Sequence, residues 1–358
     1  MRRRRAGGAA LLLVSVLSVA FIAAVPVAAK PVPREFFGIA PQGPIGASDL
    51  NRMEGAIGTL RIPFVWAEIE TQPGVRDFGR YDDLLGAAAE RGIRVLPIVY
   101  GTPGWLSSQP ARPPLGVAAR RAWSSFLGVL VARYGDDGSF WEGRPRRAPI
   151  HDWQIWNEPN FRLFWLPRPS PRGYARLLEI SARTIRRVDS RARIVTGGVA
   201  PVGAGLLPWV YLRRLYRVPG VERNFDLVAV HPYAPTVRRM GLQLEAARIV
   251  MDAAGDDQTP LLVSEFGVAS HGAIPSAFVR GVRGQAAFAR GSLHLLLAKR
   301  RAWRIVGADW FTWQDGLGPD LHCSFCEGAG MLDREGKPKP VWRSFRRLAM
   351  AAGRRGVR

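Results

Sequence analysis

The chain has 358 residues, of which 47% are hydrophobic and 10% are aromatic. It can therefore bury a large core, as one large domain or two small ones, and this composition excludes an intrinsically disordered protein. The formal net charge is +22, from 51 basic and 29 acidic residues, and a protein this basic favours acidic partners.

The first thirty residues differ from the rest of the chain. Residues 2–5 are all arginine, residues 11–29 are almost wholly apolar, and small residues end this run before Lys30. The pattern predicts an export signal over residues 1–29, so we expect a secreted or extracytoplasmic protein. The apolar run also has the length of a membrane-spanning helix, and an uncleaved anchor that holds the protein at the membrane stays open as the alternative.

Export narrows the choice of acidic partners. Outside the cytoplasm these are anionic polysaccharide, cell-wall polymer or lipid headgroups, and we expect no nucleic acid because no recognition motif occurs in the sequence. A second explanation of the charge is a compositional bias spread over helix surfaces. Only four of the 51 basic residues are lysine, namely Lys30, Lys299, Lys337 and Lys339.

From Glu35 onward, short β-branched runs alternate with longer amphipathic segments, which is the pattern of parallel strands joined by helices. Eight strands are predicted, at residues 36–40, 59–65, 95–100, 152–156, 193–197, 227–231, 261–265 and 306–312. Helices are predicted between them and after the last one, at residues 48–57, 81–91, 117–134, 171–188, 206–216, 239–254, 280–300 and 341–351.

Eight strand–helix units favour a closed α/β barrel. The sequence thus predicts a single (β/α)8 TIM barrel domain over residues 34–352, followed by a basic tail at residues 353–358. The runner-up is an open doubly wound sheet, but no glycine-rich phosphate turn follows the first strand. We expect the barrel to be a monomer.

Cys323 and Cys326 are the only cysteines and have the spacing C-x-x-C. Two thiols do not make a structural zinc site without further ligands, and His322 alone adds too little. In an exported protein a local disulfide that fixes a loop is therefore predicted. A free or redox-active pair is the alternative.

Two carboxylates are expected at the mouth of the barrel, where the reactive groups of this fold lie. The fourth strand leads into Trp156-Asn157-Glu158-Pro159, and the proline stops the strand from continuing. The seventh strand is an apolar, buried run that ends at Glu265, and a charged group there has to be paired or functional. If the carboxylates lie about 5 Å apart, they suit double displacement at a sugar carbon.

Other polar side chains at strand ends are candidates for holding these carboxylates in different protonation states. Arg61 near the end of the second strand is placed to keep Glu265 ionised, and His231 and Tyr233 follow the sixth strand as hydrogen-bond donors to Glu265 or to sugar hydroxyls. The structural alternatives are an Arg61–Glu265 ion pair without chemistry and a core histidine. Tryptophans at strand ends are candidates for sugar-binding platforms or for packing: Trp66, Trp105, Trp156, Trp310 and Trp313.

At these residues the chain resembles the large superfamily of retaining glycoside hydrolases, and among them families 39 and 5. The similarity extends over Leu60-Arg61-Ile62-Pro63, Thr102-Pro103-Gly104-Trp105 and the two carboxylate segments. By this resemblance, Glu158 is the acid/base, Glu265 the nucleophile, and Asn157 binds the 2-hydroxyl of the sugar. Arg61, His231 and Tyr233 match the shell around the nucleophile, and Trp310 or Trp313 matches a sugar platform on the eighth strand.

The sequence therefore predicts a glycosidase that hydrolyses a β-linked oligo- or polysaccharide, which the charge allows to be anionic. Its mechanism is double displacement, for which two carboxylates suffice, so neither a metal nor an organic cofactor is expected. The alternative is a catalytically silent glycan-binding envelope protein on the same barrel, whose basic surface holds an acidic polymer.

Overall fold

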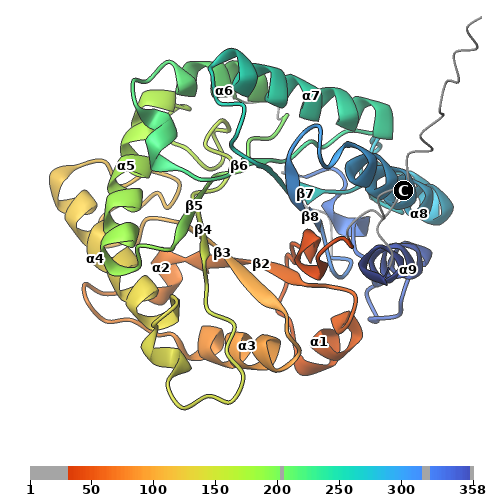
Figure 1. Ribbon diagram of the computed structural model, residues 1–358, viewed down its shortest axis with the longest axis horizontal. Coiled ribbons are helices and arrows are strands. Elements are labelled where there is room, and N and C mark those ends of the chain that lie inside the picture. The colour runs from red at the N-terminus through yellow and green to blue at the C-terminus, as the bar shows by residue number, and fades with distance from the viewer. Residues whose placement is uncertain (1–30, 202–204, 317–322, 355–358) are drawn as a thin grey trace, which may run out of the picture.

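The computed structural model describes residues 31–201, 205–316 and 323–354, and the predicted leader lies outside them. Eight parallel strands surround the centre of the molecule, with the helices outside (Figure 1). The strands are β1 (Phe37–Ile39), β2 (Thr59–Val65), β3 (Arg94–Tyr100), β4 (Asp152–Ile155), β5 (Arg193–Thr196), β6 (Val228–Val230), β7 (Leu261–Phe266) and β8 (Ile305–Trp310). Each corresponds to a predicted strand.

The strands form one sheet in the order β5-β4-β3-β2-β1-β8-β7-β6, so β1 pairs with both β2 and β8. Two parallel bridges, Val195 with Leu227 and Val199 with Val230, join the remaining edges. The sheet is thereby closed into the predicted (β/α)8 barrel.

The helices run back along the outside of the barrel (Figure 1). They are α1 (Ala47–Met53), α2 (Trp66–Ile69), α3 (Gly79–Glu90), α4 (Val117–Tyr134), α5 (Pro171–Val188), α6 (Pro208–Tyr216), α7 (Val237–Ala253), α8 (Gly281–Lys299) and α9 (Pro340–Arg354). The one-turn helix α2 was not predicted, and α9 extends two residues into the predicted basic tail. Within the described ranges, no helix is both long and apolar enough to cross a membrane.

The core has two parts because each strand is buried on both faces. All six residues of β7 are buried. The large cluster lies between the sheet and the helices, and a small one fills the barrel interior with Leu96, Val195, Leu227, Ala229 and Leu262. The interior above this small cluster is polar, and there the candidate site is built.

Helix α5 illustrates how the outer layer positions the mouth. Ser170 caps its first turn by accepting a hydrogen bond from the backbone of Gly173, and Pro171 occupies the first helical position, which tolerates proline. The buried Tyr174 then donates its hydroxyl to the carbonyl of Ile155 at the end of β4. The helix is thus tied to the strand that delivers Glu158.

Cys323 and Cys326 form a disulfide with a Cα–Cα distance of 5.5 Å, as the sequence predicted. The bond closes a short loop after β8, between the end of the undescribed residues 317–322 and the 3-10 turn Cys326–Gly328. This loop holds Phe325, whose side chain lines the mouth of the barrel.

Candidate active site

The backbone after β4 takes an unusual path that brings Glu158 to the barrel mouth. Trp156 and Glu158 both have positive φ angles, of 68° and 36°, which cost non-glycine residues about 1–3 kcal/mol each. Trp156 is anchored because its backbone N–H donates to Val99 and its ring is fully buried. Glu158 is buried, with 7% of the residue exposed. Strain of this kind persists where the surroundings fix the conformation.

Glu265 approaches from the opposite side of the barrel, near the end of β7, and is 8% exposed. An oxygen of Glu265, an oxygen of Glu158 and a ring nitrogen of His231 all lie within 4.8 Å of one another. The predicted pair of carboxylates is therefore brought together. Such a distance between single oxygens of the two groups is compatible with the separation of about 5–5.5 Å between the carboxyl groups of double-displacement enzymes.

Arg61 connects the two sides of the site. Its guanidinium donates to Oε1 of Glu265 at 2.5 Å, to Oδ1 of Asn157 at 3.0 Å and to Oε1 of Gln154 at 2.6 Å. Gln154 in turn donates to the carbonyl of Thr196 at 3.0 Å. Because the fork of the guanidinium is planar, these partners fix both its position and the nucleophile candidate that it binds.

Two residues that follow β6 complete the shell. The Tyr233 hydroxyl donates to Oε2 of Glu265 at 2.6 Å. The Nδ1 atom of His231 lies 2.9 Å from Oε1 of Glu158 and 3.6 Å from Oε2 of Glu265, so its main contact is with the acid/base candidate rather than with the nucleophile candidate. Gly198 makes room for the imidazole, because a Cβ atom there would lie 2.0 Å from Nε2.

These contacts separate the two carboxyl groups electrostatically. Burial raises the pKa of Glu158 above the usual range, and its contact with His231 only partly opposes this effect. Burial also acts to raise the pKa of Glu265, but His231, the positive charge of Arg61 and the hydrogen bond from Tyr233 outweigh it and hold that pKa low. One group is thus favoured as an acid and the other as an anion.

The carboxylates lie at the base of a cleft of about 420 Å³. Arg61, Asn157 and Tyr233 also line it, as the sequence predicted. The predicted tryptophan platforms do not: Trp310 and Trp313 are buried, and Trp105 donates its indole N–H to the carbonyl of Glu70 outside the cleft. The aromatic side chain that lines the cleft at this edge of the barrel is Phe311, one residue after the end of β8.

Glu158, His231 and Glu265 are close enough to surround a small cation. Both oxygens of Glu265 are already engaged, by Arg61 and by Tyr233, so a cation would compete with a guanidinium for its ligand. The donor set therefore fits carboxylate chemistry better than metal binding. That the chemistry needs no metal or cofactor stays a prediction.

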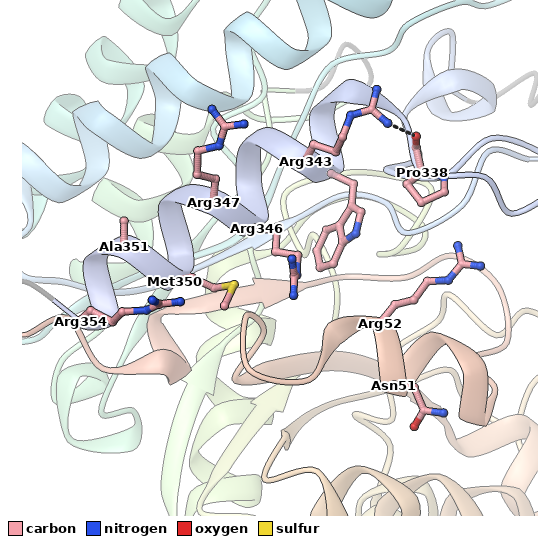
Figure 2. A pocket seen from close by; sticks show the side chains of 10 residues that line it. Asn51, Arg52, Pro338, Arg343, Arg346, Arg347, Met350, Ala351 and Arg354 are labelled. Atoms are coloured by element: carbon pink, nitrogen blue, oxygen red, sulfur yellow. Dashed lines mark hydrogen bonds between the residues drawn. The ribbon is translucent and has the colours of Figure 1, made fainter.

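A wider hollow of about 1000 Å³ lies on the outside of the barrel, between α1 and α9. Figure 2 shows that arginine side chains from both helices surround it. None of its lining residues is acidic; they are Asn51, Arg52, Pro338, Trp342, Arg343, Arg346, Arg347, Met350, Ala351 and Arg354. We call it the arginine groove. Part of the positive charge is thus gathered in one place.

No protein family model matches the chain, and no curated protein matches its sequence. Solved structures do match. A family 39 glycoside hydrolase from Bacteroides cellulosilyticus has a TM-score of 0.66 at 20% identity, over 89% of this chain and 64% of that one. A monomeric beta-xylosidase from Caulobacter crescentus has a TM-score of 0.65 at 19% identity, over 90% and 69%.

A family 5 glycoside hydrolase from Bifidobacterium longum, solved with the disaccharide Manβ1-4GlcNAc, has a TM-score of 0.66 at 15% identity, over 88% of this chain and 78% of that one. This chain spans less than two thirds of the length of the Bacteroides enzyme. Identities this low establish the fold alone. The fold is the (β/α)8 barrel of family 39 and family 5 glycoside hydrolases, so the predicted resemblance is confirmed for the fold.

Proposed function

We propose that the chain is a retaining glycosidase that cleaves O-glycosidic bonds of a β-linked substrate. One observation carries this proposal: Glu158 and Glu265 face each other within 4.8 Å, and their surroundings move their pKa values in opposite directions. The barrel shared with glycoside hydrolases supports it. The fold alone would not suffice, since a fold hosts many functions.

The reaction has two displacements. In the first, a carboxylate oxygen of Glu265 bonds to the anomeric carbon while Glu158 gives its proton to the departing glycosidic oxygen. In the second, Glu158 removes a proton from water, the water oxygen bonds to the anomeric carbon, and the ester bond to Glu265 breaks. Both carboxyl groups return to their starting states, and the sugar keeps its anomeric configuration.

The neighbours of Glu265 have distinct roles in this scheme. Arg61 and Tyr233 hold its two oxygens and stabilise the anion that attacks. Burial and the charge of Glu265 raise the pKa of Tyr233 well above its usual value, so its hydroxyl stays a donor. Asn157, whose side-chain oxygen accepts from Arg61, keeps its amide N–H groups for the 2-hydroxyl that the resemblance assigns to it.

The finer features of the function extend this proposal. The sequence indicates a β-linked oligo- or polysaccharide as the substrate class, and solved structures of similar fold include enzymes described as a beta-xylosidase and an exo-beta-1,4-mannosidase. The leader sequence supports a secreted or extracytoplasmic protein that the N-terminal segment can hold at the membrane. The substrate is then met outside the cytoplasm.

The test compares wild-type protein with Glu265→Gln and Glu158→Gln on a panel of aryl β-glycosides. Glu265→Gln should reduce turnover by at least about 10⁴-fold, since the nucleophile is lost. Glu158→Gln should lower turnover less for aryl substrates with good leaving groups than for those with poor ones, because good leaving groups need little protonation. The control is Glu54→Gln, which removes an exposed carboxylate at the end of α1. Unchanged activity of Glu265→Gln would remove this residue from the mechanism.

A second candidate function is glycan binding without catalysis, and the arginine groove favours it. Arg52 donates to the carbonyl of Gly336 at 2.5 Å. Arg343 donates to that of Pro338 at 3.1 Å (Figure 2), so two guanidinium groups of the groove are fixed. If an acidic polymer binds in the arginine groove, its affinity should fall when three of the four α9 arginines that line the groove are replaced with glutamine.

The control for that variant is Arg213→Gln, Arg214→Gln and Arg217→Gln, because it removes the same charge from an exposed stretch at the end of α6. Equal loss of retention on an immobilised acidic polysaccharide in both triple variants would indicate a net-charge effect instead of a site. Binding of a glycan without turnover of any glycoside would favour this second function over hydrolysis.

A further inference from the structure

The walls of the cleft above the carboxylates are aromatic on both sides. On the side of β7 and β8, Phe278, Phe311 and Phe325 line it. On the side of β3 and β4, Tyr100, Phe161 and Phe164 do so. In the barrel these two sides face each other across the mouth (Figure 1). The cleft is therefore a slot between two aromatic surfaces.

Each surface is a connected cluster of rings. Phe325 stacks on Phe278 with 4.9 Å between ring centroids and a 20° angle between planes, and it lies 5.2 Å from Tyr233. On the other side, Phe164 lies 6.2 Å from Tyr100 and 6.3 Å from Phe161. These separations are typical of favourable aromatic pairs, so each wall is a packed surface rather than a set of isolated rings.

The wall of β7 and β8 is also fixed in place and continuous with the reactive group. The disulfide between Cys323 and Cys326 closes the loop that carries Phe325, which restricts the positions of its ring. Tyr233 contacts this ring and donates its hydroxyl to Glu265. An apolar group held against Phe325 therefore lies next to the nucleophile.

The polar lining is sparse by comparison. Beyond Arg61 and the two carboxylates, the described lining offers the polar side chains of Gln42, Asn157 and Ser324, besides the Tyr hydroxyls. A buried sugar hydroxyl without a hydrogen-bond partner is unfavourable by about 1–3 kcal/mol. These groups suffice for one sugar ring at the carboxylates, whereas a second and third ring between the phenylalanines would leave several hydroxyls unpaired.

We infer that the substrate is a β-glycoside whose leaving group is an apolar aglycone, of the alkyl or aryl class, seated between the two aromatic walls. This inference rests on the proposed function and narrows its substrate class. The partly exposed rings, together with Leu163 at 41% exposure, present an apolar surface to water in the free protein. An apolar aglycone covers this surface, and the hydrophobic effect then contributes to cleavage.

The test is a series of n-alkyl β-glycosides from ethyl to octyl, made with the sugar that the aryl panel identifies and used below their micelle concentrations. Their leaving alcohols have nearly equal acidity, so a trend in kcat/KM reports contacts of the chain. A fully buried methylene corresponds to about a fourfold change. We expect at least about a twofold rise in kcat/KM per added methylene, until the cleft is filled.

Variants test whether the dependence of kcat/KM on the length of the alkyl chain arises at Phe325. Phe325→Ser should lower the octyl-to-ethyl ratio of kcat/KM about tenfold, and Phe325→Leu, which restores apolar surface, should recover most of it. Ile249→Ser is the matched control, because Ile249 is 60% exposed on α7, away from the cleft. It should leave the ratio unchanged.

The outcomes separate the inference from the function on which it rests. Hydrolysis with a flat alkyl series, or a β-linked tetrasaccharide that is preferred over the octyl glycoside, would overturn the apolar aglycone and leave the glycosidase intact. If the folded wild-type protein turned over no aryl or alkyl β-glycoside, the proposed function would be rejected, and the inference with it.

Discussion

Asp309 lies inside the barrel on β8 and is 1% exposed. Its side chain occupies space that Gly38 of β1 leaves open, because a Cβ at that glycine would lie 1.7 Å from its Oδ1. Neither of its carboxyl oxygens has a hydrogen-bond partner among the described residues. Burial therefore raises the pKa of Asp309 to about 8. Replacing it with asparagine removes a titrating group and nearly preserves the shape.

The sign of the expected effect follows from this shift. The pKa is higher in the folded chain than in the unfolded one, so the carboxyl group favours folding fully only below its unfolded pKa, near 3.8. As the pH rises from there toward 8, that stability is lost. At about 1.4 kcal/mol per pKa unit, the loss at pH 7 is about 4 kcal/mol. Asp309→Asn should not show this loss.

The assay is thermal unfolding of wild type and Asp309→Asn at pH 4.5 and pH 7.5. For a domain of this size, 4 kcal/mol corresponds to about 6 °C in Tm. We expect similar Tm values at pH 4.5 and a variant that is several degrees more stable at pH 7.5. Asp257→Asn, at an exposed aspartate, serves as the control. Parallel pH dependence of wild type and Asp309→Asn would refute the reasoning.

Three further predictions concern the site and its support. Gly198→Ala places a Cβ 2.0 Å from Nε2 of His231, so kcat/KM should fall at least about tenfold with an unchanged circular dichroism spectrum; wild-type kinetics would contradict this. Because burial raises the pKa of Glu158, its ionisation should set the alkaline limb of the pH profile of kcat/KM, and a limb that persists in Glu158→Gln would assign it elsewhere. Lys339→Met should destabilise the fold by about 3–5 kcal/mol, since its buried ammonium group donates a hydrogen bond to the buried carboxylate of Asp315. The control Lys337→Met, at an exposed lysine, should leave Tm unchanged in the same unfolding assay.

The barrel could be predicted because its strands are buried on both faces and stand out as short apolar runs between amphipathic segments. The carboxylates could be predicted for the same reason. Glu265 is polar at the end of a wholly buried strand, and Glu158 precedes a proline that stops β4. A group that is expensive to bury at such a place has to be paired or functional, so its position is informative.

The aromatic platform near the end of β8 was predicted wrongly, because the apolar side chains of a strand buried on both faces do not themselves show which of them point inward. Trp310 packs outward against Phe266 and Phe288, whereas its neighbours Asp309 and Phe311 lie in the barrel interior and at the cleft. The aromatic character of Trp310 suggested a sugar platform. The side chain that reaches the cleft is that of Phe311, which follows Trp310 and points to the opposite side of the chain.

Gln154 was missed although the sequence carried a signal for it. It is a polar residue in the middle of a buried strand, between Trp153 and Ile155, and it accepts a hydrogen bond from Arg61. Asp309 stands in β8 in the same way, between Ala308 and Trp310. A polar residue amid such a run indicates an inward position in the polar part of the barrel, since the opposite face meets the helices.

The two chemically identical carboxylates have different protonation states because residues of other parts of the barrel surround them differently. Arg61 of β2 and Tyr233 after β6 both bind Glu265, while Glu158, among the residues that the structure describes, has a side-chain hydrogen bond only with His231. Two glutamates this close and equally buried would otherwise share a proton, because both cannot be ionised cheaply. The guanidinium of Arg61 and the phenol of Tyr233 favour ionisation of Glu265 over ionisation of Glu158. The proton then stays on Glu158, where protonation of a leaving oxygen requires it.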